Sequence, residues 1–353
     1  MKTTRRTFLE ILTVTGAGLA VSPILAAGSA PKVLPLIKPP RLRPGDTVGI
    51  VTPASAPFNV HQTIIEATEK LKNLGFQVKI GKNVGKKWGF LAGKDQERVA
   101  DLHQMFRDPE VKAIIALRGG YGSARLLPLL DVKLIQQHPK IIVGYSDITA
   151  LNVGIHQLTG LVTFHGPVAI STFTDYTRKY FLKTLESTEP VGEIEDAPYE
   201  ANLQTSNRVW TIHGGKARGR LIGGNLTLLT ATLGTPYEMD TRGRILFIEE
   251  VGEEPYDVDR KLTHLAHAGK LQECAGIVFD RMPSVKPSNL DPAFYTNLSV
   301  EEVIEDHIAR LGIPACFGLS LGHVKHKPTL PMGILAELDA DKGRITLLEG
   351  AVV

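Results

Sequence analysis

The stretch "IIVGYSDITALN" (141–152) changes from an apolar run to a helical pattern within a few residues. Its first part is β-branched and apolar, as in a buried strand, and its second part has the apolar spacing of a helix. Between them, Gly144-Tyr145-Ser146 matches the first half of the G-x-S-x-G pattern, in which a sharp strand-to-helix turn exposes a nucleophilic serine. The second glycine is absent, because Ile148 occupies its position. Since Ser is also a preferred helix cap, Ser146 has two interpretations here, nucleophile or cap.

The same alternation of apolar strands and helical periodicities extends through the first half of the chain. It is typical of a parallel sheet that is covered by helices. The predicted strands are 47–52, 77–80, 111–117 and 140–145, and the predicted helices are 60–74, 95–107, 122–130 and 147–158. We therefore expect a Rossmann-like α/β domain with a parallel sheet at 46–172, whose ligands gather at the carboxyl ends of its strands.

The second half of the chain is expected to form another domain of the α/β class. Residues 173–215 contain scattered Pro, Asn and Ser with weak periodicity, which indicates a connector. The pattern of 216–353 then indicates a C-terminal mixed α/β domain. Its predicted strands are 244–251 and 275–280, its predicted helices are 256–268 and 299–311, and an alternating segment near the end predicts a hairpin with its turn at Asp341-Lys342-Gly343.

The N-terminus has the pattern of an export signal. Arg5 and Arg6 lie in "TRRTFL" (4–9), a twin-arginine pattern, and a mildly apolar run follows it. Thr, Gly, Ser and Pro interrupt this run, which makes it too polar for a membrane span. We expect a twin-arginine signal peptide at 1–30, a Pro-rich leader at 31–45, and no stable membrane span after the signal is removed. The expected location is the periplasm.

Composition and charge exclude several classes of function. The 353 residues are 43% hydrophobic and 22% charged, which suffices for a sizeable core without a metal or disulfide framework. The formal charge of +3 falls to about +1 without the signal peptide, and no basic patch suggests binding to nucleic acid. Cys274 and Cys316 lie in apolar runs and form no C-x-x-C motif, which excludes zinc ribbons and thioredoxin chemistry. Two buried free thiols are the simpler interpretation, although an exported protein permits a disulfide.

A glycine-rich turn follows another predicted strand. In "ALRGGYGSARLL" (116–127), Arg118 and three glycines precede a predicted helix. The backbone N–H groups of such a turn suit an anion or an oxyanion, although a tight turn with positive φ is a purely structural alternative. The spacing fits neither the dinucleotide-binding G-x-G-x-x-G pattern nor a P-loop. If the serine is a nucleophile, the N–H groups of Asp147 and of Gly119 or Gly120 could hold its oxyanion.

A serine nucleophile also needs a general base and a carboxylate that orients the base. The strand "RILFIEEV" (244–251) ends in Glu249 and Glu250. A carboxylate at the end of a buried strand is unfavourable unless it is paired, and Glu249 better continues the inward-facing parity of the strand. Spacing alone does not decide between the candidate bases, which are His165 and, in the loop after a short strand at 316–320, His323 and His326.

Four segments of the chain together resemble the LD-carboxypeptidase family, which also contains the microcin C self-immunity peptidases. The resemblance implies a Ser-Glu-His hydrolase in which Ser146 is the nucleophile, His323 the base and Glu249 the residue that orients the base. It also implies an oxyanion hole built from the N–H groups of Asp147 and Gly120. The four segments are "LRGGYGSARLLPLLD" (117–131), "VGYSDITALN" (143–152), "RLIGGNLTLLTATLGTPYE" (220–238) joined to "ILFIEEVGEEPYDVDRKLTHL" (245–265), and "GLSLGHVKHKPTLPMG" (318–333).

The resemblance further implies that the substrate is the murein tetrapeptide, cut before its terminal D-alanine, that no metal or organic cofactor takes part, and that the protein is a homodimer. Arg118, Asn225 and Arg260 are candidate contacts with the substrate, although Asn225 could simply cap the following helix. Two other functions stay open. One is a microcin C-type self-immunity amide hydrolase with the same triad. The other is a non-enzymatic periplasmic peptide-binding protein, which would not need Glu249 and His323 to meet.

Overall fold

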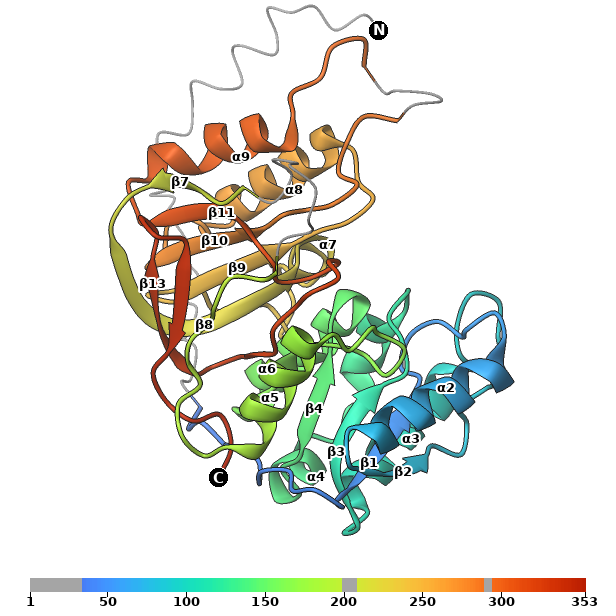
Figure 1. The fold of residues 1–353 in the computed structure, drawn as a ribbon. Helices are drawn as coiled ribbons and strands as arrows, with labels where there is room; N and C mark the ends of the chain where they lie inside the picture. Colours follow the sequence, from blue (N-terminus) through green and yellow to red (C-terminus); the bar gives the residue numbers. More distant parts are fainter. Residues whose placement is uncertain (1–33, 199–207, 289–293) are drawn as a thin grey trace, which may run out of the picture. The chain divides into compact units, whose positions relative to one another are not determined.

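Two β-sheets organise the residues that the computed structural model describes, 34–198, 208–288 and 294–353 (Figure 1). Within these residues, one sheet has six strands in the order β12-β5-β4-β3-β1-β2, and the other has eight in the order β6-β14-β13-β8-β9-β10-β11-β7. The expected signal peptide and the first residues of the expected leader lie outside the described residues. None of the helices in the described part of the chain combines the length and apolar composition that crossing a membrane requires.

The first half of the chain builds the six-stranded sheet, as its alternating pattern predicts. The strands inside this sheet are apolar, lie parallel to one another and are buried between helices on both faces, which is the expected α/β arrangement, while the edge strand β2 is partly exposed. The strands are β1 (Thr47–Val51), β2 (Gln77–Ile80), β3 (Val111–Ala116), β4 (Ile141–Gly144) and β5 (Phe164–His165), and the helices are α2 (Val60–Asn73), α3 (Asp95–Arg107), α4 (Val132–Gln137) and α5 (Thr149–Thr159).

The predicted helix at 122–130 is a 3-10 helix instead, η2 (Ser123–Leu129). Pro128 lies inside it and has no N–H to donate, and the N–H of Leu130 bonds to the carbonyl of Leu127, an i→i−3 contact. A second short 3-10 helix, η3 (Ser146–Ile148), leads from β4 into α5. Both short helices follow neighbouring parallel strands, η2 after the glycine-rich turn that leaves β3 and η3 directly after β4.

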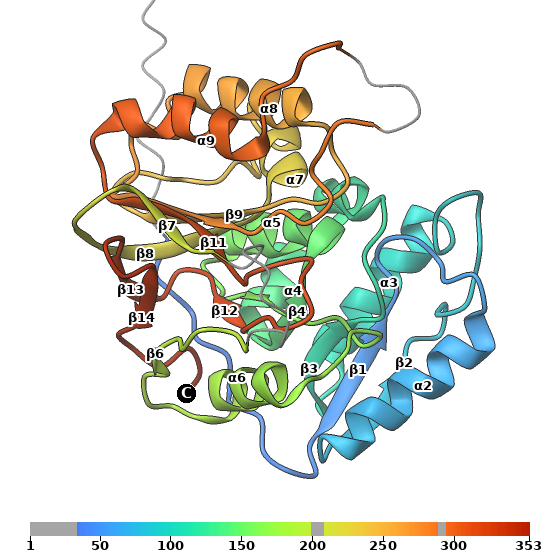
Figure 2. The same cartoon turned by 45° about the horizontal axis from the view of Figure 1, so that its top comes forward.

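The second half of the chain builds most of the eight-stranded sheet. Its four central strands are parallel, and the outer pairs are antiparallel. Helices α8 and α9 cover one face (Figures 1 and 2). The strands are β6 (Gly192–Glu193), β7 (Trp210–His213), β8 (Lys216–Asn225), β9 (Ile245–Glu249), β10 (Gly276–Asp280), β11 (Ala315–Leu319), β13 (Leu335–Asp339) and β14 (Arg344–Leu347), and the helices are α7 (Leu226–Ala231), α8 (Pro255–His267), α9 (Val300–Ile308) and η5 (Ala309–Leu311).

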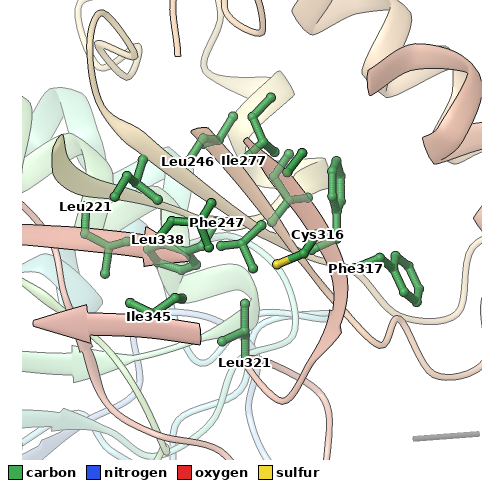
Figure 3. Close-up of a cluster of buried hydrophobic side chains, with 14 of the residues drawn as sticks. Leu221, Leu246, Phe247, Ile277, Cys316, Phe317, Leu321, Leu338 and Ile345 are labelled. Atoms are coloured by element: carbon green, nitrogen blue, oxygen red, sulfur yellow. The ribbon is translucent and has the colours of Figure 1, made fainter. Parts of the chain in front are cut away.

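The core of this sheet is aliphatic and aromatic. Leu246, Phe247 and Ile277 are fully buried, and Figure 3 shows them beside side chains from the neighbouring strands. Cys316 lies in the same cluster, and both it and Cys274 are buried free thiols. The hairpin predicted at the end of the chain is present, because Asp339 pairs with Arg344 across the expected turn.

The expected connector at 173–215 needs correction, because a helix occupies part of it. Helix α6 (Asp175–Glu186) begins at Thr174, whose side chain accepts the N–H of Thr177. The helix buries Tyr176, Tyr180 and Phe181 on one face. The scattered Pro, Asn and Ser and the weak periodicity of this region suggested a connector, but these aromatic residues at helical spacing bury enough apolar surface to fix a helix. Strand β7 also falls within the predicted connector and pairs with β11.

The chain returns to the first sheet near its end. Strand β12 (Leu330–Pro331) pairs antiparallel with β5, and the N–H of Met332 donates to the carbonyl of Thr163 at 2.8 Å. The segment between β11 and β12 therefore leads from the eight-stranded sheet to the six-stranded sheet (Figure 2). This crossing segment, residues 320–329, contains His323.

Candidate active site

The turn after β4 holds Ser146 in a strained conformation. Its φ is 62°, in the left-handed region that residues other than glycine rarely occupy, at a cost of about 1–3 kcal/mol. Gly144 makes the sharp turn sterically feasible, since a Cβ at this position would lie 2.6 Å from a methyl carbon of Ile148. Ser146 does not act as a helix cap, because the N-cap of α5 is Ile148 and no side chain caps it. The strain presents the hydroxyl at the strand end, as a nucleophile elbow does.

His323 joins this serine to a buried carboxylate. Its Nε2 lies 3.1 Å from the Oγ of Ser146, and its Nδ1 lies 2.7 Å from the Oε2 of Glu249. Glu249 is the last residue of β9, and its side chain is fully buried. A carboxylate can only accept, so Nδ1 carries the proton that is donated to Glu249, and Nε2 is left to accept from the serine hydroxyl. The structure thus brings the three expected residues into one chain of hydrogen bonds.

Two buried carboxylates control the imidazole. Burial opposes protonation of His323, but the hydrogen bond and charge of Glu249 outweigh it, so the pKa of His323 is raised above its ordinary 6.5. Asp280, at the end of β10, is fully buried, which raises its pKa to about 6. Its Oδ1 accepts the N–H of Leu321 at 2.7 Å, two residues before the histidine. Asp280 therefore fixes the start of the crossing segment.

The glycine-rich turn after β3 lies against the serine. A Cβ on Gly119 would lie only 3.0 Å from the Cβ of Ser146, so the close approach favours glycine. The carboxylate of Asp147 accepts the N–H groups of Gly122 at 3.2 Å and of Ser123 at 2.8 Å, which ties this turn to the serine turn. Burial raises the pKa of Asp147, and these hydrogen bonds oppose the rise.

The expected oxyanion donors remain available for a ligand. Tyr121 donates its N–H to the Oγ of Ser55 at 3.1 Å, so the turn is held on its other side as well. The N–H groups of Gly120 and Asp147 meet no acceptor among the described residues. Two such donors next to a serine hydroxyl are what a developing oxyanion requires.

These groups open onto a cleft of about 500 Å³. Ser146, His323 and Gly120 line it, and the cations Arg118, Lys325 and Lys327 line it as well. No carboxylate occurs among the described residues that form its lining. The cleft therefore suits an anionic ligand.

The three expected substrate contacts differ in their positions. Arg118 lies in the cleft lining and donates from Nη1 to the carbonyl of Ala56 at 3.3 Å. Asn225 and Arg260 are not lining residues. The side chain of Asn225 is buried, accepts the N–H of Leu228 at 3.4 Å and so caps α7, the alternative considered from the sequence.

Arg260 lies on the surface of α8. Its side chain is 70% exposed, pairs with Asp257 at 3.0 Å and lies over the ring of Tyr256 at 5.1 Å. An i,i+3 ion pair on an exposed helix is a common surface feature, and it accounts for this arginine without a ligand. The sequence showed its position after an acidic segment but not the direction of its side chain.

The two other candidate bases do not bond to the serine. His165 is fully buried, its Nε2 lies 3.1 Å from the carbonyl of Leu321, and burial lowers its pKa to about 4. His326 instead contacts the Oγ1 of Thr174 through Nδ1 at 3.0 Å. Both rings therefore support the crossing segment rather than the serine.

Sequence reasoning missed two features of the site. Lys327 is only 5% exposed, although lysine is normally a surface residue. Glu250, the neighbour of Glu249, is also buried, and its carboxylate accepts the N–H of Thr227 at 2.9 Å and the side-chain amide of Asn225 at 2.8 Å. The spacing of Lys327, four residues after His323 in the sequence, was the available signal, but its burial depends on contacts with distant residues.

Known proteins share this arrangement of sequence and fold. Two family models match the chain, the LD-carboxypeptidase N-terminal domain at residues 48–166 and the LD-carboxypeptidase C-terminal domain at residues 218–338. The probable murein peptide carboxypeptidase of Bacillus subtilis (strain 168) is 43% identical over 310 residues, which cover 86% of this chain and 91% of that protein. The microcin C7 self-immunity protein MccF of Escherichia coli is 31% identical over 342 residues, which cover 89% of this chain and 96% of that protein.

A solved structure agrees with this assignment. The muramoyltetrapeptide carboxypeptidase from Oxalobacter formigenes superposes with a TM-score of 0.71 and 31% identity, covering 85% of this chain and 97% of that one. The two family models together match more than half of the chain. The chain therefore belongs to the LD-carboxypeptidase family, peptidase S66, and is a carboxypeptidase.

Proposed function

We propose that this carboxypeptidase releases the terminal D-alanine of the murein tetrapeptide by acyl transfer to Ser146. The observation that carries the proposal is the continuous hydrogen-bond chain from Glu249 through His323 to Ser146, which ends in a cationic cleft. Nucleophile, base and orienting carboxylate come from three different segments and still meet at hydrogen-bond distance, the geometry of an activated serine.

The first half of the reaction forms an acyl-enzyme. His323 takes the Oγ proton of Ser146 at Nε2, Oγ bonds to the scissile carbonyl carbon, and the N–H groups of Asp147 and Gly120 hold the oxyanion. Glu249 stabilises the imidazolium through Nδ1–H. The imidazolium then gives its proton to the nitrogen of D-alanine, the C–N bond breaks, and D-alanine leaves.

The second half restores the enzyme. Water enters the position of the leaving amine, and His323 removes one of its protons as the oxygen attacks the acyl carbon. A second oxyanion forms at the same two donors and collapses with loss of the Ser146 oxygen, which regains its proton from His323. The tripeptide product leaves with a new carboxylate. Every step uses groups of this chain and water.

The chemistry of the cleft favours this substrate. A murein tetrapeptide carries several free carboxylates, and the cleft offers Arg118, Lys325 and Lys327. The relatives from Bacillus subtilis and Oxalobacter formigenes are named for murein peptide and muramoyltetrapeptide substrates. The microcin C-type self-immunity activity considered from the sequence would cut the amide of an aminoacyl sulfamoyl adenylate, and the cleft would then have to accept a nucleotide.

The experiment compares the purified protein beginning at residue 31 with its Ser146→Ala variant. Both are incubated with murein tetrapeptide, and released D-alanine is measured with a D-amino acid oxidase assay. We expect release by the wild type and none by the variant. No release from tetrapeptide together with cleavage of an adenylate amide would overturn the proposal.

We further propose that the protein acts in the periplasm as a homodimer. Arg5 and Arg6 in the twin-arginine pattern support export, and the family resemblance supports the dimer. Replacing both arginines by lysine should retain the protein in the cytoplasmic fraction, whereas the unchanged sequence should appear in the periplasmic fraction. Sedimentation equilibrium should give twice the chain mass, and a monomer at micromolar concentration would refute the dimer.

A further inference from the structure

The cleft has an unusual wall residue, Lys327. It is 5% exposed, yet it belongs to the lining of the cleft that contains Ser146 and His323. A lysine is rarely buried unless its charge is compensated, because removing an ammonium group from water is unfavourable by several kcal/mol. Its charge therefore needs an explanation.

No side chain compensates this charge among the described residues. The contact of its Nζ is with the ring of Tyr145, whose centroid lies 5.0 Å away. Asp280 and Glu249 attract the ammonium from a distance, but neither lies within the range of an ion pair. Burial lowers the pKa of Lys327, as expected for a cation that has lost water without gaining a counter-ion.

The position of Lys327 is fixed by its backbone. Its N–H donates to the Oγ1 of Thr177 at 3.2 Å, and Thr177 is fully buried on α6. The neighbouring His326 contacts Thr174, the N-cap of the same helix, at 3.0 Å. Pro328 follows directly and restricts the backbone further. The first turn of α6 thus places the lysine at the cleft, so its burial is built into the fold.

We infer that the ammonium of Lys327 binds the terminal carboxylate of the amino acid that the enzyme releases. This inference rests on the proposed function and adds to it the group that recognises a free C-terminus. A buried cation without a counter-ion, placed at a substrate cleft, is complementary to one negative charge that arrives with the ligand.

The direction of proton transfer supports this assignment. His323 must protonate the leaving nitrogen, so the released amino acid lies on the His323 side of Ser146. Its carboxylate carbon is about 2.5 Å from that nitrogen, across a single Cα. Lys327 lies on this side, because the Tyr145 ring that it contacts is 4.9 Å from the His323 ring.

Arg118, which lines the same cleft, is the other candidate for this carboxylate. It begins the glycine-rich turn that contains Gly120, so it accompanies the oxyanion donors. The acyl portion of the substrate extends away from the leaving group, so Arg118 is placed to meet its carboxylates instead. The two cations therefore divide the substrate between them, with Lys327 on the leaving amino acid.

The inference predicts selectivity for a free carboxylate. A C-terminal amide would cover the buried ammonium of Lys327 without pairing its charge, so the amide should react on the order of 100-fold more slowly than the acid. The same cation would exclude peptides that continue beyond the released residue. Lys327 would thus make the site a carboxypeptidase rather than an endopeptidase.

The experiment measures kcat/KM for the murein tetrapeptide and for the same peptide with a C-terminal carboxamide. The proteins are the wild type, Lys327→Met, Arg118→Met and, as a matched removal of an exposed charge, Lys342→Met, whose side chain is 72% exposed. We expect the ratio of kcat/KM for the free acid to kcat/KM for the amide to fall from about 100 in the wild type to below about 5 in Lys327→Met. The fall should come from slower reaction of the free acid. It should stay near the wild-type value in Arg118→Met and Lys342→Met.

The ratio is internal to each protein, so partial unfolding of a variant does not change it. Hydrolysis of p-nitrophenyl acetate, which has no carboxylate, gives the concentration of intact sites and should be retained in Lys327→Met. An unchanged ratio in Lys327→Met, with D-alanine release by the wild type, would overturn the inference and leave the proposed function standing. A ratio lost only in Arg118→Met would also overturn it. A wild type that releases no D-alanine would overturn both.

Discussion

Asp147 and Ser123 are joined by a reciprocal pair of hydrogen bonds. The carboxylate of Asp147 accepts the backbone N–H of Ser123 at 2.8 Å, and the hydroxyl of Ser123 donates to the carbonyl of Asp147 at 2.5 Å. Asp147 is the second residue of η3, which follows β4, and Ser123 is the first residue of η2, which follows β3. The pair therefore locks the turn of the serine onto the turn of the glycines, and with it the relative positions of the two expected oxyanion donors.

Replacing Asp147 by asparagine should weaken both stability and catalysis. An amide keeps one acceptor but turns an NH₂ group toward a buried N–H donor, which costs about 1–3 kcal/mol of unfolding free energy. Loss of this pair should also shift the N–H groups of Asp147 and Gly120 from the position of the oxyanion. We therefore expect kcat for D-alanine release to fall by about 10- to 100-fold. Asp131→Asn is the matched control, since Asp131 accepts the N–H of Leu134 at 3.0 Å at the start of α4. It should lose stability alone, and an unchanged kcat in Asp147→Asn would contradict the expectation.

Replacing Ser146 by glycine should stabilise the protein while abolishing its activity. The φ of 62° is strained for serine and allowed for glycine, so urea unfolding should show a gain of about 1 kcal/mol. Ser146→Ala should be equally inactive without the gain, because alanine keeps the Cβ. Equal stability of the two variants would show that the turn is not strained.

The acidic limb of the kcat/KM profile should lie above pH 6.5. The neutral imidazole of His323 is the active base, and its net pKa shift is upward from 6.5, so the rate should rise as pH increases through this raised pKa. Removing the carboxylate in Glu249→Gln leaves burial as the main influence on the imidazole, so the limb should move to lower pH. The plateau should also fall by about 10²- to 10⁴-fold.

Glu273→Gln, which neutralises an exposed glutamate, is the control for this profile. It should leave both the limb and the plateau in place. A limb that stays fixed in Glu249→Gln would mean that this carboxylate does not set the protonation of His323.

The two cysteines should react with Ellman's reagent only after unfolding. Cys274 and Cys316 are buried free thiols, and burial raises the pKa of each to about 12, so neither forms a thiolate at neutral pH. We expect no colour from the native protein and two equivalents per chain in guanidinium, in agreement with the two cysteines of the sequence. Fewer than two equivalents from the unreduced protein would indicate a disulfide.

The sequence could predict the meeting of the serine and glycine turns because parallel strands impose it. Both turns follow strands of one parallel sheet, whose carboxyl ends lie together at one edge. Glu249 was recognisable because a carboxylate closing a buried strand requires a partner. The choice of His323 over His165 and His326 came from the family resemblance, since only the folded chain shows which ring reaches the serine.

Burial that depends on distant residues was not predictable in this way. The polar neighbours of Lys327 in the sequence are typical of a surface loop, and its burial follows from contacts with α6, while Asn225 at the end of β8 is buried beside Glu250, which follows β9. Helix α6 was itself missed, because its polar composition hid the aromatic face that fixes it. The sequence pattern therefore predicts where strands and helices end, whereas tertiary packing determines which polar side chains are buried.

The crossing segment also affects when the enzyme can begin to work. Ser146 and His323 are 177 positions apart, and the segment that carries the histidine is anchored at its far end where β12 pairs with β5 in the first sheet. A ribosome completes the serine long before it completes that strand. The nascent chain therefore remains inert while most of it is already made, and a truncation just before residue 330 would silence the enzyme without removing any of the three hydrogen-bonded residues.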